Sequence, residues 1–405
     1  MDKNCNCIEE KVLFKNEQKM KIGIITILKC NNFGAELQAF ATQKKLELLG
    51  YDAEIIDYLY FKHPKFKFTK RCRPFVHFSL KTKILEFVKY RIISPILYNV
   101  IPYFSATLRK RNNKFDSFHL NNTKMSTTFS SIDELYSEKF NYDGYLVGSD
   151  QVWNPGTGVT IEPYFLTFAQ NNKPKIAYAS SFGVTSIPSQ YLPNYQKLLG
   201  NLDRISVRED AGAKIVKDIT GRKAEVVLDP TLLLNKEEWN RFGSGTNPSP
   251  QGYVLIYEVH PSVQIQNLAF KYAKEHNLPI YRIGVRGLLN WGNKGITNLC
   301  SIGPDDFISL FNNATIIFTN SFHGTAFSVN FAKQFYTVLS KQGKKNSRMT
   351  SLLNILNLSS RIIYDSDEIN NIKWKKVNTK ESQELLNVER DKSVAFLTKS
   401  LKNNV

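Results

Sequence analysis

The sequence predicts an α/β fold built from two Rossmann-like halves, and three observations lead to this prediction. Short apolar strands alternate with helix-patterned segments along most of the chain, as in parallel sheets covered by helices. A polar segment rich in Gly, Ser and Pro, residues 243–252, divides the series in two. The chain has 405 residues, too many for one ordinary core. We therefore expect a cleft between facing carboxyl ends of the strands, where doubly wound proteins bind ligands.

The first half opens with a βαβ unit. Residues 21–27 are an apolar strand, a polar turn containing Gly34 follows, and residues 35–50 carry apolar side chains at helical spacing. Residues 53–58 form the second strand. Strands and helices alternate again after residue 125. Strands are expected within 142–150, 174–183, 204–210 and 224–230, and a helix over 210–221.

The second half repeats the pattern. Strands are expected within 253–259, 279–284, 315–320 and 334–339, and helices up to His276, after Pro304 and over 324–333. The domain boundaries that follow are an N-terminal tail (1–19), an N-terminal α/β domain (20–242), a C-terminal α/β domain (253–360) and a C-terminal helical tail (361–405).

A basic segment, residues 61–125, interrupts the first half and is predicted to be a helical insertion. It holds 15 Lys and Arg against Glu86 and Asp116, so it carries +13 of the net charge of +18. Nucleic-acid binding would require a recognisable fold motif beside the charge, and none is found. An anionic membrane surface or a lipid-linked phosphate fits the charge, and so does a solvated helical face.

Neither the cysteines nor the chain ends indicate a disulfide-bonded, metal-binding or membrane-spanning protein. The five cysteines include no CxxC pair, so no disulfide framework or zinc site is expected. Residues 1–19 lack an apolar signal segment, which predicts a cytoplasmic protein. The longest apolar stretch, residues 84–106, contains Lys, Arg and Pro and is not expected to cross a membrane, although it could lie on a membrane surface.

One predicted strand ends in a segment suited to sugars. The sequence LVGSDQVWNPG places Asp150 and Gln151 at the turn after an apolar strand, with Trp153 close behind. A carboxylate could bind sugar hydroxyls while an aromatic ring covers the apolar face of the sugar. The alternative is a turn capped by Asp150, with Trp153 in the core.

Two further strand ends carry groups that suit anions and proton transfer. Arg208 ends a strand, where its guanidinium could grip a carboxylate or phosphate, or could instead pair with its acidic neighbours. In TNSFHGTAFS, Ser321, His323 and Gly324 lie at a strand-to-helix turn, where a helix N-terminus favours anions. His323 could exchange a proton near neutral pH, or close the strand as a structural residue. The sequence lacks GxGxxG, P-loop, HExxH and GxSxG motifs.

Together these stretches resemble the polysaccharide pyruvyl transferase family. The similar segments occur in family order and cover about residues 21–340. They are NNFGAELQAFA, YDGYLVGSDQVWN, KIAYASSFG, SVREDAGAK, EVVLDPTLLL and TNSFHGTAFS, followed by NSRMTSLLNIL.

The resemblance implies a GT-B-like arrangement of the two halves, with the basic insertion in the N-terminal half. It also implies transfer of an enolpyruvyl unit from phosphoenolpyruvate to a sugar of a cell-surface polysaccharide or its lipid-linked precursor. The product is a pyruvate ketal, phosphate is released, and no cofactor or metal is expected. The expected partners are this donor, the glycan acceptor and an anionic surface at the inner membrane face, without nucleic acid.

The resemblance implies donor binding by Arg208 and an acid or base role for His323. With the strand-end residues above, the catalytic candidates are His323 and Asp150, and the acceptor-binding candidates are Asn32, Gln151 and Trp153. The donor-binding candidates are Arg208, Ser321, Gly324 and Arg348. Many members carry an arginine where this chain has Ser321. Either another cation binds the donor here, with Arg348, Lys341 and Arg286 as candidates, or this branch uses a different donor. Two alternatives stay open: a glycosyltransferase using a nucleotide sugar, and a non-catalytic glycan- or phosphate-binding protein.

Overall fold

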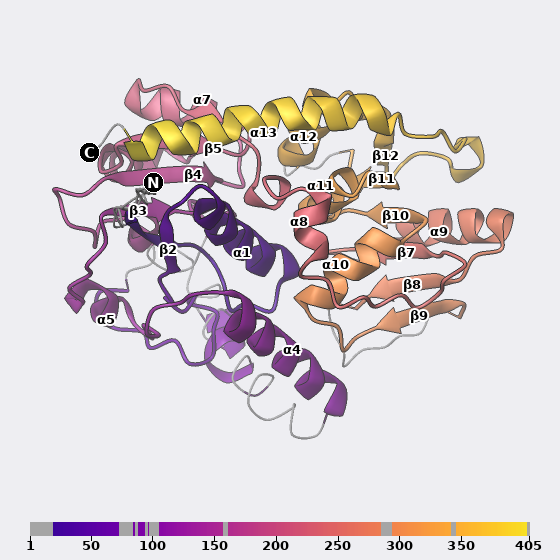
Figure 1. Cartoon of the computed structure of the whole chain (residues 1–405), viewed down its shortest axis with the longest axis horizontal. Coiled ribbons are helices and arrows are strands. Elements are labelled where there is room, and N and C mark those ends of the chain that lie inside the picture. Colours follow the sequence, from indigo (N-terminus) through magenta and orange to yellow (C-terminus); the bar gives the residue numbers. More distant parts are fainter. Residues whose placement is uncertain are drawn as a thin grey trace, which may run out of the picture.

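The structure, a computed structural model, describes residues 19–72, 84–85, 88–93, 96, 105–156, 161–284, 294–341 and 346–402. Within these residues the chain forms two parallel sheets of six strands each, with helices packed against them (Figure 1). The prediction of two Rossmann-like halves in a GT-B-like arrangement is confirmed. Arg286, one of the predicted cations, lies outside the described residues.

The sheet of the N-terminal half has the order β2-β1-β3-β4-β5-β6. Its central strands are nearly continuous apolar runs because helices cover both faces of the sheet. The strands are β1 (Lys21–Ile25), β2 (Asp52–Ile55), β3 (Gly144–Val147), β4 (Lys175–Ser180), β5 (Arg204–Val207) and β6 (Glu225–Val226). The helices of this half are α1 (Phe33–Leu48), α5 (Ile132–Ser137), α6 (Leu192–Gly200) and α7 (Asp210–Thr220).

The sheet of the C-terminal half has the order β12-β11-β10-β7-β8-β9. Its strands are β7 (Val254–Tyr257), β8 (Ile280–Ile283), β9 (Ile296–Leu299), β10 (Ile316–Thr319), β11 (Gln334–Leu339) and β12 (Ile362–Tyr364). Its helices are α8 (Lys236–Asn240), α9 (Val263–His276), α10 (Pro304–Asn313), α11 (Phe322–Asn330) and α12 (Ser347–Ile355). The sequence did not predict β9 and β12, which are short, partly exposed edge strands.

The sequence predicted a separate C-terminal tail beyond residue 360. The structure shows instead that this segment is part of the fold. β12 is an edge strand of the C-terminal sheet, and α13 (Thr379–Lys402) lies across both halves (Figure 1). Gln383 Nε2 donates to Val329 O of α11 at 2.7 Å, while Phe396 packs near Tyr178 of β4 with ring centroids 6.4 Å apart. The helix therefore starts on the C-terminal half and ends on the N-terminal half.

The described part of the basic insertion includes α4 (Ala106–Asn122), which connects the two halves. Arg111 of α4 is buried, and its guanidinium donates to Asn31 O at 3.1 Å and to Gly284 O at 3.4 Å. Lys114 forms an ion pair with Asp306 of α10. None of the described helices is both long and apolar enough to cross a bilayer.

Candidate functional site

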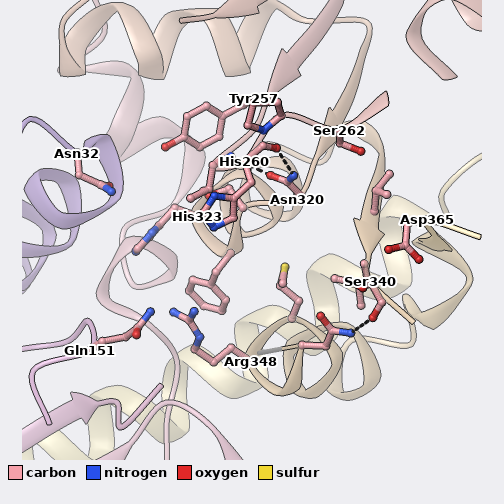
Figure 2. A pocket seen from close by; sticks show the side chains of 18 of the residues that line it. Asn32, Gln151, Tyr257, His260, Ser262, Asn320, His323, Ser340, Arg348 and Asp365 are labelled. Carbon is pink, nitrogen blue, oxygen red and sulfur yellow. Dashed lines mark hydrogen bonds between the residues drawn. The ribbon is translucent and has the colours of Figure 1, made fainter. Parts of the chain in front are cut away.

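A cavity of about 630 Å³ lies between the halves, at the carboxyl ends of their strands. From the N-terminal half it is lined by Asn32, Asp150 and Gln151. The C-terminal half provides the rest of the wall, including His260, Asn320, His323, Ser340, Arg348 and Asp365 (Figure 2). The predicted cleft is therefore present, and six of the nine predicted site residues line it: Asn32, Asp150, Gln151, Ser321, His323 and Arg348.

Three helices direct their N-termini to this cavity, because the residue that caps each of them lines it. Asn32 Oδ1 accepts the N–H of Gly34 at 3.0 Å and caps α1. Ser321 Oγ accepts the N–H of Gly324 at 3.3 Å and caps α11, and Ser262 Oγ accepts the N–H of Ile265 at 3.3 Å and caps α9. The positive ends of three helix dipoles converge, which favours an anionic ligand.

His323 lies in the first turn of α11, at the boundary between the halves. Its side chain is 10% exposed, and its ring packs against Gly34 in the first turn of α1. A Cβ atom on Gly34 would lie 2.0 Å from His323 Nδ1, so the backbone can approach the ring this closely only at a glycine. Gly34, in the segment NNFGAELQAFA, and His323, in the segment TNSFHGTAFS, thus form a contact between the halves.

Beneath the cavity, the buried carboxylate of Asp229 joins groups from both halves. Arg208 Nη1 donates to Asp229 Oδ2 at 2.7 Å, and Ser149 Oγ donates to the same oxygen at 2.8 Å. His323 Nε2 lies 3.8 Å from that oxygen. Asp229 Oδ1 accepts the N–H of Thr231 at 3.0 Å and its Oγ1–H at 2.7 Å. Both carboxylate oxygens are therefore held.

The charges of this cluster are set by burial and by pairing. Burial disfavours the charged form of Asp229, but His323, Arg208 and the hydrogen bonds outweigh it and lower its pKa to about 2. Burial also opposes the charge of Arg208, yet Asp229, Asp150 and Glu209 raise its pKa. For His323, burial and then the charge of Arg208 outweigh Asp229 and lower its pKa. At neutral pH the site thus contains a neutral imidazole beside a fixed ion pair.

Arg348 is a cation that faces the cavity. Its guanidinium lies 5.8 Å from the ring centroid of Phe322, and within the described part of the chain it makes no hydrogen bond or ion pair. Burial, and then repulsion from Arg208, lower its pKa to about 10, so it is still cationic at neutral pH. Figure 2 shows Arg348 extending from the C-terminal half toward Gln151 of the N-terminal half.

Asp150 and Gln151 form a tight turn at the end of β3. Asp150 has a left-handed φ of 75°, which is costly for a residue with a side chain, and its Oδ1 accepts the N–H of Gln151 at 2.8 Å. The turn packs on Gly183, where a Cβ would lie 2.3 Å from Gln151 Oε1. The strained backbone presents the Asp150 carboxylate, which is 20% exposed, to the cavity.

Trp153 does not contact the cavity, so the prediction that it binds a sugar is wrong. The residue is fully buried, its ring stacks on Phe165 with centroids 5.1 Å apart, and Nε1 donates to Tyr164 O at 2.8 Å. Asp150 lines the cavity, and the turn that follows it places Trp153 in the core of the N-terminal half. The alternative that placed Trp153 in the core holds.

Two predicted donor-binding residues also lie behind the cavity wall. The Arg208 side chain is 1% exposed, engaged by Asp229, and covered by Phe322, whose ring centroid is 4.5 Å from Arg208 Cζ. Gly324 is buried, and a Cβ there would lie 2.2 Å from Thr319 Oγ1, so this glycine allows α11 to pack on β10. Neither lines the cavity, and nor does Lys341, which is exposed outside it.

Asp229 is a site residue that the sequence did not reveal, as are His260, Asn320, Ser340 and Asp365 of the cavity wall. Its segment, VVLDPTLLL, has the same pattern as the segment of Asp150, an apolar run ending in Asp, and this was the available signal. No group of three His, Cys, Asp or Glu residues with the geometry of a metal site occurs among the described residues.

The family model described as polysaccharide pyruvyl transferase matches residues 32–341, which include every residue of the cluster around Asp229. The chain belongs to the polysaccharide pyruvyl transferase family. The resemblance predicted from the ordered motifs is thereby confirmed. No curated protein sequence matches this member of the family.

Similar solved structures are enzymes of sugar metabolism. UDP-N-acetylglucosamine 2-epimerase from Rickettsia bellii has 12% identity and a TM-score of 0.45, over 95% of this chain and 98% of that one. UDP-GlcNAc 2-epimerase from Neisseria meningitidis, bound to UDP-GlcNAc, has 10% identity and a TM-score of 0.44, over 95% and 94%. ADP-heptose lps heptosyltransferase II from E. coli has 11% identity and a TM-score of 0.40, over 91% and 99%.

Proposed function

We propose that this member of the family transfers the enolpyruvyl unit of phosphoenolpyruvate to a sugar and closes a pyruvate ketal on it. The observation that carries the proposal is Arg348, a cavity-facing cation without a hydrogen-bonding partner among the described residues. The N-termini of α1, α9 and α11 add to the positive potential around it. Phosphoenolpyruvate carries a phosphate and a carboxylate, the groups that arginine binds with two parallel hydrogen bonds.

Arg348 of α12 takes the donor-binding role that many family members give to an arginine at the position of Ser321. Ser321 caps α11, a task that its hydroxyl performs with the N–H of Gly324. Arg348 comes from α12 and extends into the same cavity as Ser321. The cationic charge missing at position 321 is thus supplied by α12.

In the proposed reaction, one hydroxyl of the acceptor attacks C2 of the donor while the methylene carbon gains a proton. A second hydroxyl of the same sugar then displaces phosphate, and the second C–O bond closes the ketal. One of the two hydroxyl protons ends on the new methyl group, and the other leaves with phosphate. His323, neutral at neutral pH, accepts the proton of the first hydroxyl and passes it to the methylene carbon, and Asp150 accepts the proton of the second hydroxyl, which leaves with phosphate.

The acceptor in this proposal is a glycan or its lipid-linked precursor, and the enzyme works at the inner face of the membrane. Two features of the basic insertion support this part. Its described residues include five aliphatic side chains that are 46–60% exposed: Ile84, Leu85, Ile92, Ile93 and Ile96. The same insertion carries a net +13. Exposed aliphatic groups among basic ones are typical of segments that lie on anionic bilayers.

The test is phosphate release from phosphoenolpyruvate by the purified chain, with a panel of lipid-linked and nucleotide-linked sugars as acceptors. We expect release with at least one acceptor, and His323→Gln to slow it by about 10²- to 10⁴-fold. The matched control is His276→Gln, an exposed histidine of α9 outside the cavity, which should leave the rate unchanged.

Other outcomes would select the alternatives. Consumption of a nucleotide sugar in place of phosphoenolpyruvate would show a glycosyltransferase. Saturable binding of phosphoenolpyruvate without phosphate release from any acceptor would favour a non-catalytic binding protein. Wild-type turnover in His323→Gln would remove this residue from the catalytic machinery.

A further inference from the structure

We propose that Asp229 is the positioning residue of this site, which fixes the tautomer and the orientation of the His323 ring. The inference rests on the proposed function only in assigning proton transfer to His323. The contact itself is independent of the substrate. It joins a carboxylate of the N-terminal half to a histidine of the C-terminal half.

The Asp229 carboxylate is held at both oxygens and cannot rotate. Asp229 Oδ1 is held by the backbone and side chain of Thr231, and Oδ2 is held by Arg208 and Ser149. All these partners belong to the N-terminal half. His323 Nε2, a buried nitrogen without a hydrogen bond in this structure, lies 3.8 Å from Oδ2.

The backbone around Asp229 is held by residues of α11 and α13. Asn330 Nδ2 of α11 donates to Thr231 O at 2.8 Å and to Leu234 O at 2.9 Å. From α13, Arg390 Nε donates to Leu232 O at 2.6 Å, and Ser393 Oγ accepts the N–H of Leu228 at 3.0 Å. α11 therefore carries His323 at one end and holds the segment of its carboxylate partner at the other.

Charged groups from both halves change the pKa of His323. The charged groups that act on His323 are Asp229, Arg208 and Asp150 from the N-terminal half and Arg348 from the C-terminal half. Burial and the two arginines lower the pKa of His323, whereas the two carboxylates raise it. Asp229 has a pKa of about 2, so it stays ionised and stabilises the imidazolium without taking the proton itself.

These contacts define how the proton moves. A carboxylate facing Nε2 favours the tautomer with hydrogen on Nε2, which leaves the lone pair of Nδ1 free as the base. Nδ1 lies on the side of Gly34 and the N-terminus of α1. When the acceptor hydroxyl bonds to C2 of the donor, its O–H bond breaks and an N–H bond forms at Nδ1, while Nε2 keeps its hydrogen next to Asp229.

The experiment follows the His323 ring by NMR in the full chain with ¹⁵N-labelled histidine, without substrate. The chain has six histidines, and the His323 resonances are those that disappear in His323→Gln. In Asp229→Asn we expect the titration midpoint of His323 to move to lower pH, because a carboxylate that raised its pKa is gone. The preference for hydrogen on Nε2 should also be lost.

Activity provides the second measurement. Asp229→Asn should lower kcat at least about tenfold, with a much smaller change in KM for phosphoenolpyruvate, because the acid–base step is impaired and the cavity wall is intact. The matched control is Asp306→Asn, a buried carboxylate paired with Lys114 away from the cavity, which should leave both the NMR titration and kcat unchanged.

A wild-type midpoint and tautomer of His323 in Asp229→Asn would overturn the proposal. If that variant does not fold, Thr231→Val keeps the charge but removes one hydrogen bond to Oδ1, and it should lower kcat several-fold with KM unchanged. Wild-type kcat in Thr231→Val would then refute the positioning role. Because the NMR measurement needs no substrate, failure of the phosphate-release assay would not be confused with failure of this inference.

Discussion

The two halves share a fold but contribute different kinds of groups to the site. The N-terminal half supplies paired charge: Arg208 Nη1 and Ser149 Oγ both donate to the Asp229 carboxylate beneath the cavity. The C-terminal half supplies Arg348, which has no such partner among the described residues, and His323, whose Nε2 has none. Paired groups hold geometry, whereas unpaired groups are available to a ligand. We infer that the N-terminal half fixes the site and the C-terminal half binds and reacts.

The largest expected effect comes from the point where the halves touch. In Gly34→Ala, the new Cβ would lie 2.0 Å from His323 Nδ1, so the ring must move or the halves must separate. We expect kcat to fall by more than about 100-fold, close to the loss of the histidine itself. Helix stability should not suffer, since alanine is favoured over glycine in a helix by about 1 kcal/mol.

Gly200→Ala in α6 is the matched control, because a Cβ there meets nothing within 4 Å. It should behave as the wild type in both kcat and thermal unfolding. Full activity in Gly34→Ala would show that the His323 ring can move without loss of catalysis. It would contradict the inference that the N-terminal half fixes the geometry of the site.

A smaller effect is expected where the C-terminal half binds the donor. Arg348→Gln removes the cavity-facing cation and should raise KM for phosphoenolpyruvate about 10- to 100-fold, since a charged hydrogen bond contributes about 1.5–3 kcal/mol. The change in kcat should be modest. Arg241→Gln, an exposed arginine outside the cavity, should not alter KM. A fall in kcat at constant KM would assign Arg348 to the chemistry instead.

The smallest effect on catalysis concerns the exposed aliphatic side chains of the basic insertion. The triple variant Ile92→Ser, Ile93→Ser, Ile96→Ser should bind several-fold less to phosphatidylcholine vesicles containing phosphatidylglycerol, measured by flotation. Turnover of a soluble acceptor should not change. The control Val388→Ser, Ile355→Ser replaces aliphatic side chains exposed to 51% and 37% elsewhere.

The salt dependence of the same measurement separates the two contributions. Binding by the wild type should weaken as ionic strength rises, because basic side chains near an anionic surface are screened. Absence of binding to anionic vesicles at low salt would refute a membrane role for the insertion.

The fold was predictable because βα units of ordinary length repeat along most of the chain. The exceptions follow from the same principle. β12 has only three residues, and β9 has a partly exposed face, so neither has the apolar run of a central strand. A helical segment was expected at the C-terminal end, but no local pattern states that α13 lies across both halves.

The site was predictable where a residue at a strand end faces the cleft, as with Asp150 and His323. It was not predictable where a side chain after the strand turns back, as with Trp153, because spacing does not specify the direction of a turn. Asp229 was missed for another reason. Its partners Ser149 and His323 lie far away in the sequence, and only the packing of the halves brings all three together.

The placement of α13 has a consequence for how the protein is made. The ribosome completes the N-terminal sheet long before it synthesises α13. The surface around Tyr178 and Leu228, which α13 covers, therefore stays exposed while the C-terminal half is synthesised. Apolar surface that stays exposed during synthesis promotes aggregation. A chaperone that binds this surface until α13 has been synthesised would therefore raise the yield of active protein.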